Sequence, residues 1–99
     1  MIVVIWQYEL HPGTEADFEA LYGADGEWVG LFRQHVGYID TQLLREERPH
    51  RYLTIDRWSS LTDYTRFLDA ASGHYARIDA LGDALTLSER CIGRYTTPC

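Results

Sequence analysis

The stretch TIDRWSSLTDYTRFL, residues 54–68, changes from one kind of secondary structure to another without a linker. Its first residues combine Ile, aromatic and β-branched side chains, which is typical of a strand. From Ser60 onward the spacing of Tyr64 and Phe67 is helical. The stretch therefore predicts a strand that ends at Trp58 and a helix that begins almost at once.

The same plan occurs in the first half of the chain. Residues 2–10 are rich in Ile, Val, Trp and Tyr, which predicts a strand covered on both faces. Thr14 with Asp17, and later Ser60 with Asp63, are variants of the capping box that starts a helix. The remaining elements are predicted as a helix interrupted at Gly23 and Gly26, a hairpin of strands 37–47 and 51–59, a second helix with a break at 72–73, and a last strand at 87–97.

The resulting order, β-α-β-β-α-β, is that of the ferredoxin-like α+β fold. It predicts a four-stranded antiparallel sheet with the helices on one face, because the crossovers are right-handed. Residues 1–99 are expected to form one domain, since two smaller pieces would each be too small to hold a core.

The helix-free face of this sheet is predicted to be apolar. Both faces of the first strand are apolar in its first half: one carries Ile2, Val4, Trp6, Tyr8 and Leu10, and the other carries Val3, Ile5, Gln7 and Glu9. In the strand at 37–47, the alternation places Tyr38 and Leu44 on one face and Ile39 and Leu43 on the other. In the strand at 51–59, it places Tyr52 and Trp58 on one face and Leu53 and Ile55 on the other. An exposed patch of this kind would be adhesive. We therefore expect a homodimer in which a second copy covers this face.

Composition and charge exclude several classes of function. The net charge is −6, so a phosphate-binding surface for nucleic acid is not expected. All nine basic residues are Arg, which removes lysine-based covalent chemistry. No cluster of His, Cys and Asp has metal-ligand spacing, and no glycine-rich phosphate loop follows a strand. Seven Tyr and three Trp suggest a pocket or interface with aromatic walls.

Two further features of the sequence bear on the cellular compartment of the protein. Cys91 and Cys99 are too few for a disulfide framework. The apolar residues 2–10 are too short for a membrane span and lack the basic region of a signal peptide. A cytoplasmic protein without membrane contact is expected.

The motif W-x-S-x-x-x-Y-x-x-F, residues 58–67, resembles the antibiotic biosynthesis monooxygenase-like family, as do the segments PGTEADFEALY and GYIDTQLLRE. The resemblance covers almost the whole chain and implies a dimeric α+β barrel. It also implies a cofactor-independent monooxygenase that oxidises a small aromatic, phenolic or quinol-like compound with O₂. Such chemistry needs a dry pocket in which the substrate is bound and deprotonated.

The resemblance also suggests which residues form the site. Trp58 and Tyr64 match the family's pocket aromatics, Arg77 falls near its pocket Arg, and Thr54 stands where the anthrone-oxidising members carry Asn. We expect Trp6, Trp58, Tyr64 and Arg77 to bind substrate, and His74, Tyr64 and Trp58 to take part in catalysis. His74 is the preferred general base because the reference pKa of histidine lies near neutrality.

Each of these residues also has a structural interpretation. Trp58 could simply close the core under the helix, Tyr64 could make a structural hydrogen bond, and His74 could be exposed at the helix break. Asp56, an acidic residue in mid-strand, is expected to pair with Arg57, Arg90 or Arg94, since an unpaired inward carboxylate is costly.

Two alternative functions stay open. One is a non-catalytic small-molecule-binding or assembly domain with the same fold. The other, which fits less well, is haem degradation: His74 could be the iron ligand, but Trp6 occupies the position of that branch's Asn. The chemistry expected first needs neither metal nor organic cofactor.

Overall fold

The computed structural model describes residues 1–98, so Cys99 lies outside the described residues. It contains four strands, β1 (Ile2–Leu10), β2 (Tyr38–Arg45), β3 (Arg51–Trp58) and β4 (Thr86–Thr96). They form an antiparallel sheet in the order β2-β3-β1-β4. The helices are α1 (Glu15–Tyr22), α2 (Glu27–Phe32), α3 (Leu61–Ala70) and α4 (Ser72–Asp83).

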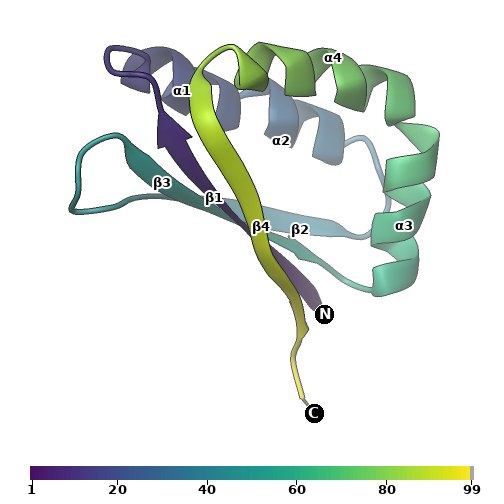
Figure 1. Ribbon diagram of the computed structural model, residues 1–99. Coiled ribbons are helices and arrows are strands. Elements are labelled where there is room, and N and C mark those ends of the chain that lie inside the picture. Colours follow the sequence, from purple (N-terminus) through teal and green to yellow (C-terminus); the bar gives the residue numbers. More distant parts are fainter. Residues whose placement is uncertain (99) are drawn as a thin grey trace.

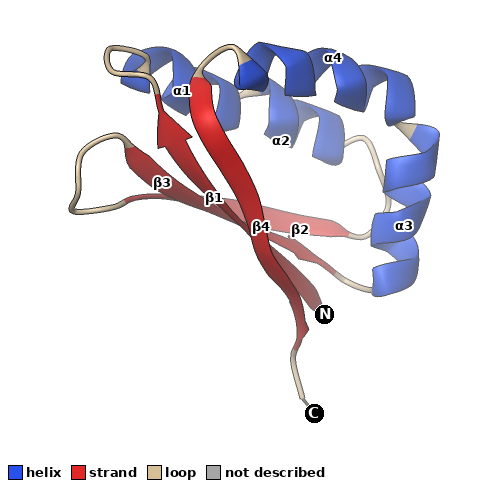
Figure 2. Cartoon of the chain, viewed as in Figure 1, coloured by secondary structure: helices blue, strands red, loops and turns tan. Residues whose placement is uncertain are grey.

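All four helices lie on the same side of the sheet, with α3 beside the ends of β2 and β3 (Figures 1 and 2). The predicted ferredoxin-like order is confirmed, and each predicted helix is a pair of shorter ones. Gly26 lies between α1 and α2. The chain turns so closely there that a Cβ on this residue would lie 2.3 Å from the Leu21 carbonyl oxygen, so the position requires glycine. The second pair divides at Ala71, one residue before the predicted break. Within residues 1–98, no helix is both long and apolar enough to cross a membrane.

The two predicted helix caps have different outcomes. The Asp63 amide donates to the Ser60 hydroxyl over 3.1 Å, so α3 is capped as predicted. The capping bond expected at Thr14 is wrong. Its hydroxyl instead donates to the carbonyls of His11 and Leu85, at 2.7 and 3.1 Å, and links the turn after β1 to the end of α4.

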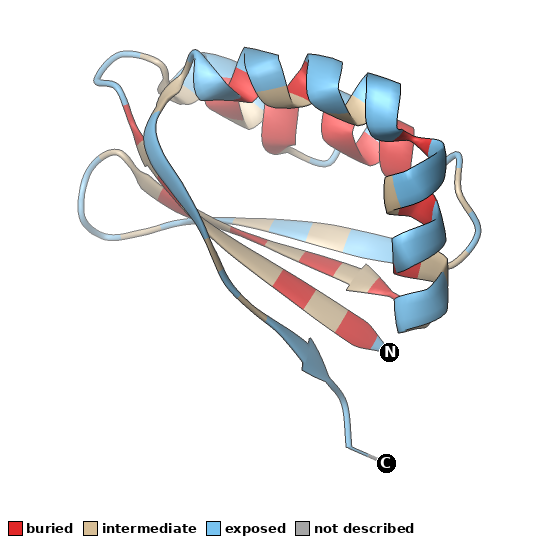
Figure 3. Ribbon diagram, turned by 45° about the vertical axis from the view of Figure 1, so that its right-hand side comes forward, coloured by how far each residue is buried: buried red, intermediate tan, exposed pale blue. Residues whose placement is uncertain are grey.

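The sheet has one buried face and one half-exposed face, seen in the alternating colours along β1 and β3 in Figure 3. Even-numbered residues of these central strands, such as Val4 and Tyr52, pack under the helices. Odd-numbered ones such as Val3, Ile5 and Ile55 point to the helix-free side and are only half-buried. The apolar helix-free surface expected from the sequence is therefore present at the centre of the sheet.

The predicted faces of β2 are wrong in part. The pairing register shifts between Tyr38 and Asp40, so Tyr38 lies opposite Trp58 on the helix side. Leu44 lies opposite Leu53 on the helix-free side, whereas Leu43 lies opposite Thr54 under the helices. A strand irregularity of this kind reverses the alternation beyond it, which a period-two pattern cannot anticipate.

Trp58 closes the corner between β3 and α3. Its side chain is completely buried, and its ring lies 5.0 Å from that of Phe67 and 5.7 Å from those of Tyr64 and Phe32. Burial of a large aromatic side chain is among the strongest single contributions to a small core. The corner at residues 58–60 therefore anchors α3 to the sheet.

Candidate functional site

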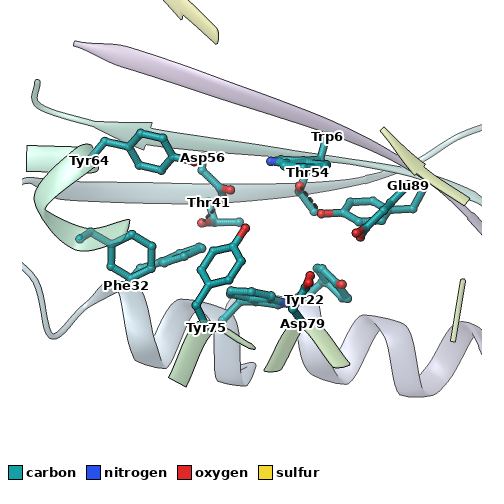
Figure 4. Close-up of a pocket in the computed structure, with 13 residues that line it drawn as sticks. Trp6, Tyr22, Phe32, Thr41, Thr54, Asp56, Tyr64, Tyr75, Asp79 and Glu89 are labelled. Carbon is teal, nitrogen blue, oxygen red and sulfur yellow. Dashed lines mark hydrogen bonds between the residues drawn. The ribbon is translucent and has the colours of Figure 1, made fainter. Parts of the chain in front are cut away.

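A cavity lies between the helix side of the sheet and the helices, and each of α1 to α4 contributes to its wall (Figure 4). Its enclosed space is about 40 Å³, and the space between its walls reaches about 540 Å³ only when the solvent-filled mouth is counted. Most of its wall is aromatic, and the rings come from both layers of the fold: Trp6, Tyr22, Trp28, Phe32, Tyr64 and Tyr75.

Asp56 is the buried carboxylate of this cavity. It occupies a helix-side position of β3 between Thr54 and Trp58 and is only 9% exposed. Its Oδ1 atom accepts a hydrogen bond of 2.7 Å from the Thr41 hydroxyl, which in turn accepts one of 2.8 Å from Tyr38. Burial raises the pKa of Asp56 to about 6, although the bond from Thr41 lowers it.

The predicted pairing of Asp56 with an arginine is wrong. Arg57 is the next residue along the strand and therefore points to the opposite face, where it pairs with Asp40 at 3.1 Å. Arg90 donates to Gln7 at 3.2 Å. Arg94 lies over the ring of Tyr64, 5.1 Å from its centroid. Within residues 1–98, Asp56 forms no ion pair.

Of the predicted site residues, Trp6 and Tyr64 line the cavity. Trp58 does not line it and lies behind Tyr64 in the core. Burial raises the pKa of the Tyr64 hydroxyl, and the Arg94 guanidinium lowers it by a smaller amount. Tyr64 therefore presents a neutral hydroxyl at neutral pH, with Arg94 over its ring.

His74 and Arg77 are not brought together with these residues. Both are exposed and border a separate open groove between α2 and α4, where Arg77 pairs with Glu27 at 3.0 Å. Helix α4 turns Tyr75 and Asp79 toward the cavity, and a residue one position away is rotated by about 100°. The structure therefore does not bring His74 together with Tyr64, and His74 has the exposed position that was its structural interpretation.

The cavity also contains acidic residues that no sequence motif marked as part of a site. Asp79 and Glu89 line it, and their carboxylate oxygens and that of Asp83 all lie within 4.8 Å of one another. Burial and repulsion between these groups raise the pKa of Asp79 and of Glu89. The spacing of Tyr75, Asp79 and Asp83 indicates that they share one face of a helix. No local sequence pattern indicates that this face lies next to Glu89 on β4.

These groups define what the cavity can do. A carboxylate with a pKa near neutrality can accept a proton at physiological pH, as a general base must. The aromatic walls can bind a planar apolar ligand and keep water from it. The arrangement suits deprotonation of an aromatic compound by Asp56.

The sequence profile of the family described as antibiotic biosynthesis monooxygenase matches residues 1–78. No curated protein sequence matches the chain. Among solved structures, SnoaB from Streptomyces nogalater, described as a cofactor-independent oxygenase, superposes with a TM-score of 0.81 at 21% identity, covering 99% of this chain and 93% of SnoaB.

Two further structures extend the comparison. A protein from Bordetella bronchiseptica, provisionally described as an antibiotic biosynthesis monooxygenase, gives a TM-score of 0.78 at 23% identity over 99% of this chain and 97% of its own. A conserved protein from Methanosarcina mazei Go1 gives a TM-score of 0.74 at 18% identity, covering 98% of this chain and 92% of its own. At these identities the structures establish a shared fold.

Proposed function

Because the chain belongs to the antibiotic biosynthesis monooxygenase family, we propose that it is a cofactor-independent monooxygenase that oxidises a small phenolic or quinol-like aromatic compound with O₂. The fold is that of SnoaB, whose description as a cofactor-independent oxygenase supports this chemistry. The observation that carries the proposal is Asp56, a buried carboxylate without an ion pair in residues 1–98, facing a cavity with aromatic walls.

In the proposed reaction, Asp56 removes the acidic proton of the bound substrate. An anthrone, the keto tautomer of a phenol, serves as the example, and its acidic proton is on the methylene group. The resulting carbanion is conjugated with the aromatic rings and transfers electrons to O₂, so that a C–O bond forms and a peroxide results. The peroxide takes up the proton from Asp56. Loss of water, with the second hydrogen of the methylene carbon, leaves a carbonyl group; one oxygen atom stays in the product and the other leaves as water.

This proposal gives the base role to Asp56 in place of His74. Trp6 and Tyr64 remain the proposed substrate-binding walls, and the Tyr64 hydroxyl can donate a hydrogen bond to the oxygen of the substrate. Trp58 supports Tyr64 from behind, because their ring centroids lie 5.7 Å apart. Arg77 lies outside the cavity, so no contact with substrate is proposed for it.

We further propose that two copies pair through the helix-free face of the sheet. Val3, Ile5, Leu53 and Ile55 form the apolar centre of that face on the two middle strands. Ion pairs lie at its margin: Arg57 with Asp40, and Arg51 with Glu9. An apolar centre with a charged margin is the usual composition of a protein interface.

A non-catalytic binding domain is the second candidate. It is favoured by the exposed position of His74 and Arg77, since the cavity lacks two of the groups expected from the family resemblance. Haem degradation fits less well, because His74, its candidate iron ligand, lies outside this cavity.

Oxygen uptake separates catalysis from binding. With a panel of anthrones and quinols, the protein should consume O₂ above the rate of autoxidation, and Asp56→Asn should lower kcat/KM by about 10²-fold, as expected for the loss of a general base. Asp69→Asn changes the charge equally at an exposed site on α3 and should leave the rate unchanged. Absence of uptake with every compound, or full activity of Asp56→Asn, would contradict the proposal.

A further inference from the structure

We propose that the hydroxyls of Thr41 and Tyr38 form a proton path between Asp56 and the outside of the protein. This inference rests on the proposed function, because it concerns the base of the same cavity. The path lets Asp56 exchange its proton with solvent while a bound ligand covers the cavity. Figure 4 shows the two inner members, Asp56 and Thr41, side by side in the cavity wall.

The three groups form a continuous chain of hydrogen bonds. Tyr38 Oη donates to Thr41 Oγ1 over 2.8 Å, and Thr41 Oγ1 donates to Asp56 Oδ1 over 2.7 Å. Both distances are typical of hydrogen bonds between hydroxyl and oxygen groups. A hydroxyl has one hydrogen and two acceptor lone pairs, so each hydroxyl can take up a proton on one side and release one on the other. In the observed orientation the chain carries a proton to Asp56, and rotation of both hydroxyls lets it carry one away.

An irregularity of β2 brings the two hydroxyls to the same face of the sheet. In a regular strand, residues three positions apart point to opposite faces. The pairing register shifts between Tyr38 and Asp40, so that Tyr38 lies opposite Trp58 on the helix side, and Thr41 lies opposite Asp56 on the same side. Strand irregularities often occur next to active sites, where they redirect a side chain. Here the irregularity makes the bond between Tyr38 and Thr41 possible.

The outer end of the chain lies at the edge of the sheet. Tyr38 is the first residue of the edge strand β2, is half-buried, and does not line the cavity. Burial raises the pKa of Tyr38, and two exposed residues act on this pKa in opposite directions, since Arg33 lowers it and Asp40 raises it. The Tyr38 hydroxyl is therefore neutral at physiological pH and lies near groups that face solvent.

Asp56 has a chemical need for such a path. It is only 9% exposed, and its pKa of about 6 means that part of the protein carries a proton on Asp56 at neutral pH. A ligand that binds to this protonated form covers the cavity before the base is free. The complex then reacts only after the proton has left, and the path through Thr41 and Tyr38 lets it leave without release of the ligand.

Hydrogen exchange of anthrone tests the path. In D₂O without O₂, Asp56 takes a proton from the methylene carbon, and the electron pair of the C–H bond stays on the ligand as a carbanion. The proton leaves through Thr41 and Tyr38, and a deuteron arrives by the same route. Asp56 transfers this deuteron to the carbon, so a C–D bond replaces the C–H bond without oxidation. Mass spectrometry of anthrone measures the rate above that of uncatalysed exchange.

Tyr38→Phe removes the outer hydroxyl and should lower the exchange rate about tenfold at a pH well above the pKa of Asp56. The rate of oxidation by O₂ should fall less, because there the proton returns to the peroxide and does not have to leave. The ratio of exchange to oxidation therefore separates a proton path from a weakened fold, which lowers both rates together. Tyr52→Phe is the matched control, since its hydroxyl donates to the Glu19 carboxylate outside the cavity, and it should keep the original ratio.

The middle of the path gives a second test. Thr41→Val interrupts the chain and should lower the same ratio, whereas Thr41→Ser keeps a hydroxyl and should restore it. An unchanged ratio in Tyr38→Phe, or an equal fall in Tyr52→Phe, would overturn this inference alone. Exchange that depends on Tyr38, without O₂ uptake by any compound, would support the path and contradict the monooxygenase alone. No exchange by the original chain would overturn the path together with Asp56 as the base.

Discussion

Asp56 illustrates how one residue can combine a structural cost with a chemical use. Its carboxylate accepts a hydrogen bond of 2.7 Å from the Thr41 hydroxyl, and burial raises its pKa to about 6. A structural carboxylate would be paired or exposed. Perturbed groups in cavities are candidate functional residues, and here the geometry supports the same conclusion.

Removal of the Thr41 hydroxyl should shift the pH dependence of activity. Thr41→Val deletes the hydrogen bond that lowers the pKa of Asp56, so this pKa should rise, and the acidic limb of kcat/KM should move to higher pH by about one pH unit. Thr41→Ser keeps the hydroxyl and should retain the original profile. A Thr41→Val profile that is only scaled down, with its midpoint unmoved, would argue against Asp56 as the base.

Replacement of Asp56 should raise the stability of the protein although it lowers the activity. The pKa of Asp56 rises from 3.8 to about 6 on folding, so between these values the unfolded chain binds fewer protons and the free energy of unfolding falls as pH rises. Asp56→Asn should therefore be more stable than the original chain at pH 7, by about 3 kcal/mol. Urea unfolding at pH 7 and again below pH 4, where the difference should vanish, measures this. Equal stability at both pH values would exclude a raised pKa.

At the scale of elements, periodicity predicted most of what the structure contains. The strands begin and end within two residues of the predicted bounds, and β1 has the two faces that its alternation indicated. The face of β2 was predicted wrongly after Tyr38, and the helix breaks were placed better than the caps. Alternation is a property of a regular strand, so it fails at the register shift.

The start of α3 gives a prediction at this scale. The Ser60 hydroxyl accepts the Asp63 amide at 3.1 Å, and Ser60→Ala should therefore lower the free energy of unfolding by about 1 kcal/mol. Ser60→Asp keeps a capping oxygen and should lose much less. Urea unfolding curves with unchanged m-values provide the measurement. A loss as large in Ser60→Asp as in Ser60→Ala would assign the effect to something other than the cap.

For the whole molecule, the helix-free sheet face is the surface through which two copies are proposed to pair. Its central side chains are only half-buried in one chain, and Leu44 and Tyr95 at its margins are 38% and 49% exposed. Contiguous apolar surface of this kind is uncommon on monomers and usually marks an interaction site. The antiparallel order β2-β3-β1-β4 places this surface opposite the cavity wall, so pairing would stiffen the sheet that carries Asp56.

A charge at the centre of this face should prevent pairing. Ile55→Glu would place a carboxylate against the same face of the second copy, and the protein should then elute as a monomer where the original chain is a dimer, by size exclusion with light scattering. Leu61→Glu changes an exposed apolar residue on α3 and should remain dimeric. A monomeric original chain at micromolar concentration would contradict the dimer itself.

The sequence by itself determined the order of the elements, the capped start of α3, the two sets of side chains on opposite faces of β1 and of β3, and the family resemblance that the match over residues 1–78 confirms. These depend on periods and caps, which are set by residues near one another in the chain. Only the tertiary structure decided that Asp56 contacts Thr41 and, among the residues that the structure describes, no arginine, that Asp79 lies close to Glu89, and that His74 lies outside the cavity. Such contacts depend on strand register and on how a packed helix is rotated about its axis. No local sequence pattern encodes either of these.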